Sequence, residues 1–148
     1  FAEAINAIQT AQLHNIICFV NIVVTDDNVN ELELLGEYVK RYGVVGVNIL
    51  HPIPSHDGHY IPTLSLDTIK QIAEVDQKHP DFFFVERCHK EYWEYVTKNK
   101  FTCRDIGKTT YFVTVDGMIS PCSKMMKYKY NSLLDMLTQY KDWECGCL

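Results

Sequence analysis

Two near-continuous apolar runs, each preceded by a helical pattern, constrain the fold of this chain most strongly. Residues 16–24 and 44–50 are rich in β-branched side chains and contain few polar positions. Such runs are typical of strands buried on both faces of a sheet. Apolar spacing over 1–14 and 30–42 predicts a helix before each strand, and Gly43 is expected to end the second helix. This order predicts parallel strands joined by right-handed crossovers.

The predicted class is therefore α/β, either a doubly wound sheet or a slice of a (β/α) barrel. In both folds, ligands bind at the carboxyl ends of the strands. Those ends are the turn at residues 25–28 and the start of a long loop at 51–64. The other predicted elements are helices over 66–78, 90–98 and 131–140 and strands over 82–85, 109–115 and 118–120, with a hairpin turn at Asp116-Gly117.

Composition excludes several classes of protein. With 47% hydrophobic and 22% charged residues, the 148-residue chain is expected to fold around a core. The net charge is −5 and the Lys and Arg residues form no long basic stripe, the nearest being 124–129, so nucleic acid is not an expected partner. No apolar run approaches the roughly 20 residues of a membrane span. We expect a cytoplasmic location and, because the chain begins with Phe1, a piece of a longer protein.

Four of the six cysteines lie in the last 46 residues, at Cys103, Cys122, Cys145 and Cys147. The first two flank the predicted hairpin, and the predicted helix at 131–140 would return the last two toward them. Four thiolates that converge in this way suit a 4Fe-4S cluster and suit tetrahedral zinc equally well. Two other interpretations stay open: buried thiols that act as small apolar side chains, and a disulfide.

The remaining reactive side chains have simpler explanations. His51, His56 and His59, with Asp57, would serve in metal or acid–base chemistry, but solvated loop side chains are the favoured interpretation. Cys18 is expected to pack inside a strand, and Cys88 to stand at a helix start. The aromatic residues are expected to belong to the core; they are Phe82, Phe83, Phe84, Tyr92 and Trp93.

The segment 114–122, Thr-Val-Asp-Gly-Met-Ile-Ser-Pro-Cys, resembles a known family. It is similar to the glycine-then-cysteine hairpin of the SPASM and twitch domains, which lie at the C-terminal end of many radical S-adenosylmethionine enzymes. In that family one cysteine precedes the hairpin, one follows it, and further cysteines come after a helix. The resemblance implies auxiliary cluster ligands at Cys103, Cys122, Cys145 and Cys147.

The upstream half resembles the second half of the partial (β/α) barrel of the same enzymes. Residues 1–14 match its fourth helix, 16–24 its fifth strand and 44–52 its sixth strand. The resemblance implies two regions: part of a TIM-like barrel over 1–100, and a small α+β region with a β-hairpin and cysteine ligands over 101–148.

The family's chemistry implies a fragment of an iron–sulfur oxidoreductase. In such enzymes S-adenosylmethionine gives a 5′-deoxyadenosyl radical that modifies a substrate, here an unidentified peptide or small metabolite. The residues implied to face the cofactor or substrate are Val24, Thr25, Asn28, Leu50 and His51, with Pro52; Val24 and Leu50 have core packing as their alternative. No catalytic residue is assigned.

The CxxxCxxC signature of the family is absent from these 148 residues. We therefore expect the isolated chain to be inactive and to supply barrel wall and an auxiliary cluster site. One alternative is a non-catalytic zinc-binding α/β module. Another is an α/β binding domain whose cysteines hold nothing.

Overall fold

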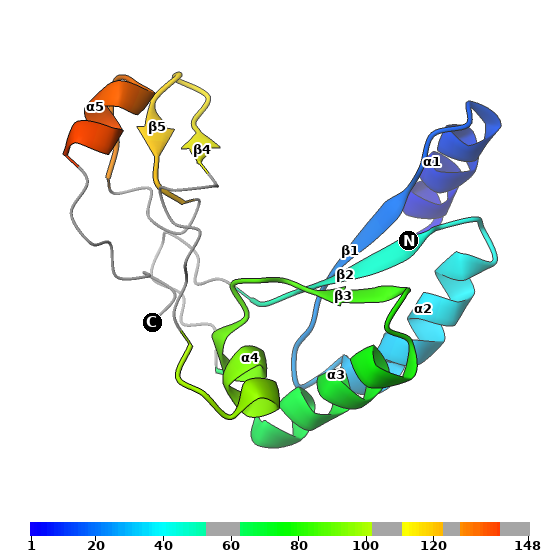
Figure 1. Ribbon diagram of the computed structural model, residues 1–148. Helices are drawn as coiled ribbons and strands as arrows, with labels where there is room; N and C mark the ends of the chain where they lie inside the picture. Colours follow the sequence, from blue (N-terminus) through cyan, green and yellow to red (C-terminus); the bar gives the residue numbers. More distant parts are fainter. Residues whose placement is uncertain (53–62, 102–110, 123–127, 140–148) are drawn as a thin grey trace. The chain divides into compact units, whose positions relative to one another are not determined.

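A three-stranded parallel sheet organises the first of two units, Phe1–Asn99 and Lys100–Leu148, in the computed structural model (Figure 1). The structure describes residues 1–52, 63–101, 111–122 and 128–139. The strands are β1 (Phe19–Val23), β2 (Gly46–Leu50) and β3 (Phe83–Val85), in the order β1-β2-β3. Both pairs are parallel, as predicted.

Helices cover one face of this sheet (Figure 1). They are the 3-10 helix η1 (Val29–Glu31), α2 (Leu32–Lys40), α3 (Leu66–Lys78) and α4 (Lys90–Thr97). The first helix, α1 (Ala2–Leu13), lies toward the amino end of β1. The helix predicted at 30–42 is thus divided into η1 and α2, and Gly43 follows with a positive φ of 78°. The helix predicted at 66–78 has those bounds, and its N-cap Ser65 accepts a hydrogen bond from the backbone N–H of Thr68.

The hydrophobic core lies between the sheet and α2 and α3. Alternate strand residues point into it because successive side chains of a strand face opposite sides. The most deeply buried members, none more than 2% exposed, include Val24, Leu32, Val39, Val47, Ile49, Ile72 and Phe83. Tyr92 of α4 joins the same cluster.

The prediction that the first strand is buried on both faces is wrong. Phe19 and Val23 of β1 are 53% and 49% exposed, and Asn21 between them is also exposed. A continuous apolar run does not reveal whether a layer covers its second face, and here the described helices cover only one. Phe84, expected in the core, is 40% exposed for the same reason.

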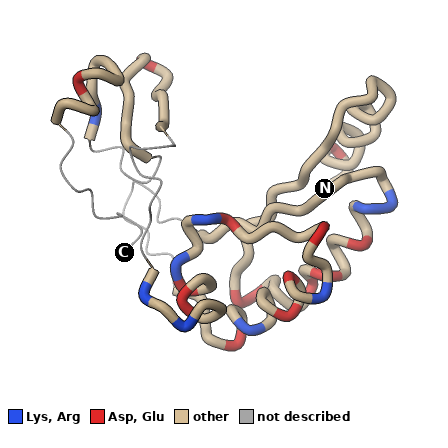
Figure 2. The backbone as a smooth tube through the Cα atoms, in the orientation of Figure 1, with Lys and Arg blue, Asp and Glu red and all other residues tan. Residues whose placement is uncertain are grey.

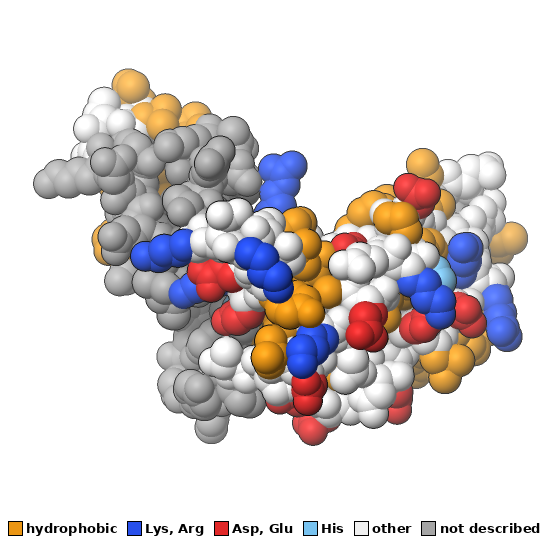
Figure 3. Space-filling view, turned by 60° about the horizontal axis from the view of Figure 1, so that its bottom comes forward, with side chains coloured by type: hydrophobic (Ala, Val, Ile, Leu, Met, Phe, Trp, Pro, Cys, Tyr) orange, Lys and Arg blue, Asp and Glu red, His pale blue; other side chains and the backbone are white. Residues whose placement is uncertain are grey.

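Charged side chains are concentrated on the helices and their connections. Figure 2 shows the three parallel strands without Lys, Arg, Asp or Glu. Figure 3 looks at the molecule from the side of α2 and α3, where basic and acidic side chains are intermixed. The helix-covered side is therefore an ordinary solvated surface. None of the described helices has both the length and the apolar character needed to cross a membrane.

The second unit contains the predicted hairpin. Strands β4 (Phe112–Val113) and β5 (Ile119–Ser120) pair antiparallel, and Gly117 in the turn has a positive φ of 78°. The backbone N–H of Thr114 donates to the Met118 carbonyl oxygen at 2.9 Å and closes the turn. The helix α5 (Leu133–Thr138) is shorter than the predicted 131–140.

Gly36 of α2 allows the helix to approach the sheet. A Cβ at this position would lie 2.2 Å from Cζ of the buried Phe83 ring. In an exposed helix, alanine would stabilise by about 1 kcal/mol relative to glycine. Overpacking of a buried ring costs about 1–3 kcal/mol. We therefore expect Gly36→Ala to lower the free energy of unfolding, which urea denaturation followed by circular dichroism measures.

The control for this substitution is Glu37→Ala, at the next, exposed position of α2. It should change the free energy of unfolding by less than about 0.5 kcal/mol. A Gly36→Ala chain as stable as the parent would contradict the close approach of α2 to Phe83.

Candidate functional site

The carboxyl end of β1 is held by the side chain of Asn28. Its Oδ1 accepts a hydrogen bond from the backbone N–H of Thr25 at 2.8 Å, and its Nδ2 donates to the carbonyl oxygen of Val23 at 3.0 Å. The turn at 25–28 is therefore closed by the side chain of its last residue. Asn28 was predicted to face the cofactor, but in this structure its side-chain amide is hydrogen-bonded to backbone groups of the loop.

Asp26 connects this turn to the start of α3. Its Oδ1 accepts from the Thr68 hydroxyl at 2.6 Å and from the backbone N–H of Ser65 at 3.0 Å. The Thr68 hydroxyl, and then the Ser65 backbone N–H, lower the pKa of Asp26 from its ordinary value, because both bonds favour the charged carboxylate. An ionised Asp26 thus fixes the loop after β1 against α3.

A second group of polar side chains lies at the carboxyl ends of β2 and β3. Glu86 directly follows β3, and its backbone N–H donates to the Ile49 carbonyl oxygen at 2.9 Å. Its Oε2 accepts from the backbone N–H of His51 at 3.3 Å. The His51 and His89 rings are 5.5 Å apart between centroids, edge to face. A carboxylate and two imidazoles are thereby grouped at the carboxyl ends of the strands, where α/β proteins bind ligands.

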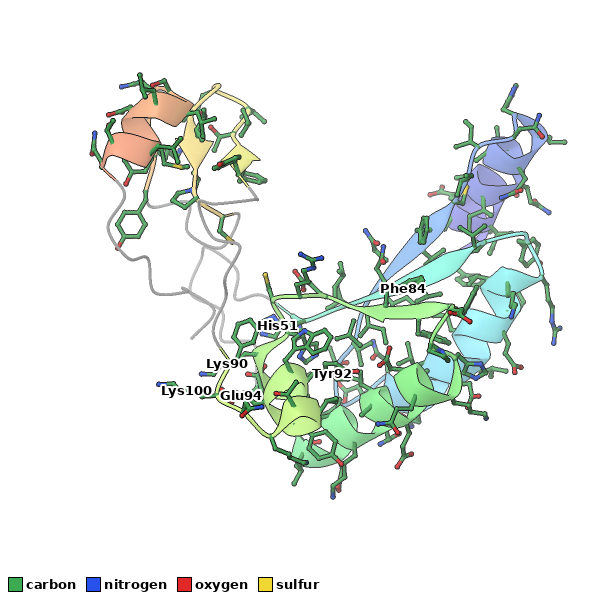
Figure 4. All side chains as sticks on the ribbon, in the orientation of Figure 1. His51, Phe84, Lys90, Tyr92, Glu94 and Lys100 are labelled. Carbon is green, nitrogen blue, oxygen red and sulfur yellow. The ribbon has the colours of Figure 1, made fainter. Side chains whose placement is uncertain are left out.

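His89 serves a structural role as well. It is fully buried, and its Nδ1 accepts from the Tyr92 backbone N–H at 3.4 Å at the start of α4. The Tyr92 hydroxyl donates to Asp76 Oδ2 at 2.5 Å, which joins α4 to α3. Burial, and then the bond to Asp76, raise the Tyr92 pKa far above its ordinary value, so the phenol remains a hydrogen-bond donor well into alkaline solution. Figure 4 labels His51 and Tyr92 in this region.

The structure distributes the predicted cofactor-facing residues between surface and core. Thr25, Leu50 and His51 are half-buried at the strand ends, and Pro52 is buried. Val24 has no exposed surface and belongs to the core, which was its alternative interpretation. Its backbone N–H donates to the Leu50 carbonyl oxygen at 3.1 Å, so the two strand ends remain side by side.

Sequence reasoning missed Glu86 and His89. The sequence does contain a signal for Glu86, because it is the first residue after the predicted strand at 82–85. Residues 25–28 and His51 were predicted from the same kind of position, directly after a strand. The charged run that follows it, Arg87 to Lys90, directed attention to Cys88 instead. His56, Asp57 and His59 lie outside the described residues.

Of the four candidate metal ligands, the structure describes Cys122. It is half-buried directly after the hairpin, where Ser120 Oγ donates to its carbonyl oxygen at 3.0 Å. Ser120 and Pro121 beside it are fully buried. Cys103, Cys145 and Cys147 lie outside the described residues, and within the described ranges no group of three or more His, Cys, Asp or Glu side chains suits a metal ion.

A surface pocket of about 330 Å³ lies elsewhere in the first unit, between α2 and the segment that joins α3 to β3. Lys40, Arg41 and His79 line it together with the buried Phe82. Lys40 lies over the Phe82 ring, with its Nζ 5.0 Å from the centroid. Lys40 and Arg41 stand at the C-terminal end of α2, where they complement the helix dipole, so a stabilising role accounts for these two cations.

Comparisons with protein-family models, with curated proteins and with solved structures found no match. The candidate site therefore stands on its geometry: a closed turn after β1, and a carboxylate–imidazole group after β2 and β3.

We predict that Thr68→Val raises the pKa of Asp26 toward its ordinary value of 3.8 and lowers stability at neutral pH. The folded-state pKa lies below the unfolded one, so the carboxylate stabilises the fold above about pH 3.8. That contribution is lost as the pH falls through the folded-state pKa. The difference in melting temperature between parent and variant should accordingly shrink in acid.

Thr10→Val is the matched control, because the Thr10 hydroxyl donates to a backbone carbonyl oxygen of α1 and touches no carboxylate. Its effect on melting temperature should be independent of pH between neutral and acid. Equal pH profiles for the two variants would disprove the role assigned to Asp26.

Proposed function

We propose that this chain is the C-terminal part of a radical S-adenosylmethionine enzyme. In this proposal residues 1–100 form one side of a partial (β/α) barrel, and 101–148 form a SPASM- or twitch-like region with an auxiliary 4Fe-4S cluster. The parent protein is an iron–sulfur oxidoreductase that modifies a peptide or small metabolite. The chain itself contributes barrel wall and cluster ligands.

The observation that carries the proposal is a parallel sheet whose described helices leave its other face uncovered. A doubly wound sheet has helices on both faces, whereas a barrel wall has its helices outside and its other face toward the interior. Phe19, Asn21 and Val23 of β1 are all exposed on the uncovered face. This one-sided burial supports the barrel alternative over the doubly wound one.

The strand ends suit a ligand wall in the proposed enzyme. Thr25, Asn28, Leu50 and His51 are the predicted residues that retain accessible surface there. Asn28 holds the loop after β1, and Val24 supports it from the core. S-adenosylmethionine, when bound, supplies the radical chemistry, and these residues position and enclose it.

The hairpin supports the second half of the proposal. Gly117 in its turn has a positive φ, which glycine adopts more readily than other residues. Cys122 follows shortly after the return strand β5. Thiolates are the ligands that iron–sulfur clusters take, and the same thiolates suit zinc. An experiment must therefore distinguish an iron–sulfur cluster from zinc at these cysteines.

The test is anaerobic iron–sulfur reconstitution of the 148-residue chain. We expect a brown protein with about four irons per chain. Cys122→Ser should lose most of the iron, since it removes a ligand. Cys18→Ser is the matched control, because Cys18 is half-buried against the core of the first unit, and it should retain the iron.

Each other outcome has a distinct meaning. A colourless chain with one tightly bound zinc, lost in Cys122→Ser, would replace the proposal by the zinc-binding α/β module. A chain that binds neither iron nor zinc would reject both the auxiliary cluster and the zinc module.

A further inference from the structure

The surface pocket beside the C-terminal end of α2 combines aromatic and charged side chains. Its volume of about 330 Å³ lies within the range of ligand pockets, about 300–1,000 Å³. The buried rings of Phe82 and Phe83 belong to its lining and stand edge to face, 5.4 Å apart between centroids. The rest of the lining is polar or charged and consists of Glu37, Lys40, Arg41 and His79. Such a lining suits a ligand with an apolar body and a charged end.

The basic side chains at the end of α3 already have a counter-ion. Glu33 Oε1 accepts from Lys78 Nζ at 2.6 Å and from His79 Nε2 at 2.7 Å. The bond from His79, and then the bond from Lys78, lower the pKa of Glu33, so its carboxylate is charged at neutral pH. The His79 ring, 5.8 Å from the Phe83 ring between centroids, is thereby held in place as one wall of the pocket.

The two cations at the end of α2 have no such partner within the described part of the chain. No described carboxylate forms an ion pair with Lys40 or Arg41, although Glu37 precedes them on the same helix at neighbouring positions. Lys40 instead lies over the Phe82 ring. The helix dipole acts on the charge of both side chains and uses none of their hydrogen-bond donors. Those donors are available to an anion beside the aromatic rings.

We propose that this pocket binds a small organic acid, a carboxylate monoanion on an apolar body about the size of one aromatic ring. Lys40 and Arg41 donate hydrogen bonds to its carboxylate, and its apolar body packs on the aromatic side of the pocket. The pocket lies beside the segment that leads into the amino end of β3. The inference is therefore independent of the function proposed for the carboxyl ends of the strands.

Size and charge favour this class of ligand. An apolar cavity of about 150 Å³ holds one benzene molecule, so the pocket has room for one ring and a short acidic chain. The planar guanidinium of Arg41 matches the two oxygens of a carboxylate. Glu37, in the same lining, repels a second negative charge on the ligand, which disfavours nucleotides and other multiply charged anions.

The experiment is a titration of the ¹⁵N-labelled 148-residue chain with phenylacetate, followed by NMR. We expect the backbone amide signals of Arg41 and Phe82 to shift and to saturate. Phenylacetamide has the same ring without the charge, and acetate has the charge without the ring. Both should therefore bind more weakly than phenylacetate.

Three variants test the assigned roles. Arg41→Gln should weaken phenylacetate binding about fivefold, the upper range for an exposed ion pair. Lys70→Gln is the matched control, because it removes the same charge from an exposed lysine of α3 that pairs with Asp67 and does not line the pocket. Glu37→Gln should strengthen binding about twofold, since it removes a like charge. A gain of affinity cannot arise from a loss of folding.

The inference is overturned if phenylacetate gives no saturable shift, or if phenylacetamide binds as tightly as phenylacetate. It is also overturned if Lys70→Gln weakens binding as much as Arg41→Gln does. Inorganic phosphate that shifts the same signals at lower concentration would replace the organic acid by a phosphate ligand. The titration uses the chain without iron, so its failure would leave the proposed function standing, and failed iron loading would leave this inference standing.

Discussion

The first unit depends on burying one face of a short parallel sheet beneath α2 and α3. Val47 and Ile49 on β2 and Phe83 on β3 supply the buried side of the sheet, and Leu32 and Ile72 supply the helices. The contact between Gly36 and Phe83 brings α2 close enough to exclude water from this layer. The hydrophobic effect supplies most of the favourable free energy in such a layer. The polar sites at the strand ends rely on the rigid scaffold that it provides.

Much of the fold can be predicted from the sequence because it follows from local patterns. The helix at Leu66–Lys78 has both a clear apolar period and a serine cap at Ser65, and its bounds were predicted correctly. The parallel arrangement followed from alternating helices and strands, and the hairpin from Asp116-Gly117. Periodicity alone does not distinguish a 3-10 turn from an α-helix, so the break at Leu32 was not foreseen.

Tertiary context decides what local patterns leave open. Phe82, Phe83 and Phe84 are chemically alike, yet strand alternation buries Phe83 and exposes Phe84. Which face of a strand is covered depends on helices distant in the sequence. The apolar run at 16–24 therefore does not indicate which of its faces is buried. In the candidate site, position after a strand predicted Thr25 and His51. The partners that fix these two segments come from remote parts of the chain, because Thr68 bonds Asp26 and Glu86 bonds His51.

The carboxylate of Asp26 accepts hydrogen bonds from Ser65 and Thr68, which lie 39 and 42 positions further along the chain. Local opening of a protein proceeds in cooperative units rather than residue by residue. The turn after β1 and the first turn of α3 share this carboxylate, and so they belong to one such unit. Amide hydrogens of Ser65 and Thr68 therefore report the state of a loop at the other end of a long connection. A ligand that orders the turn would slow hydrogen exchange at the start of α3.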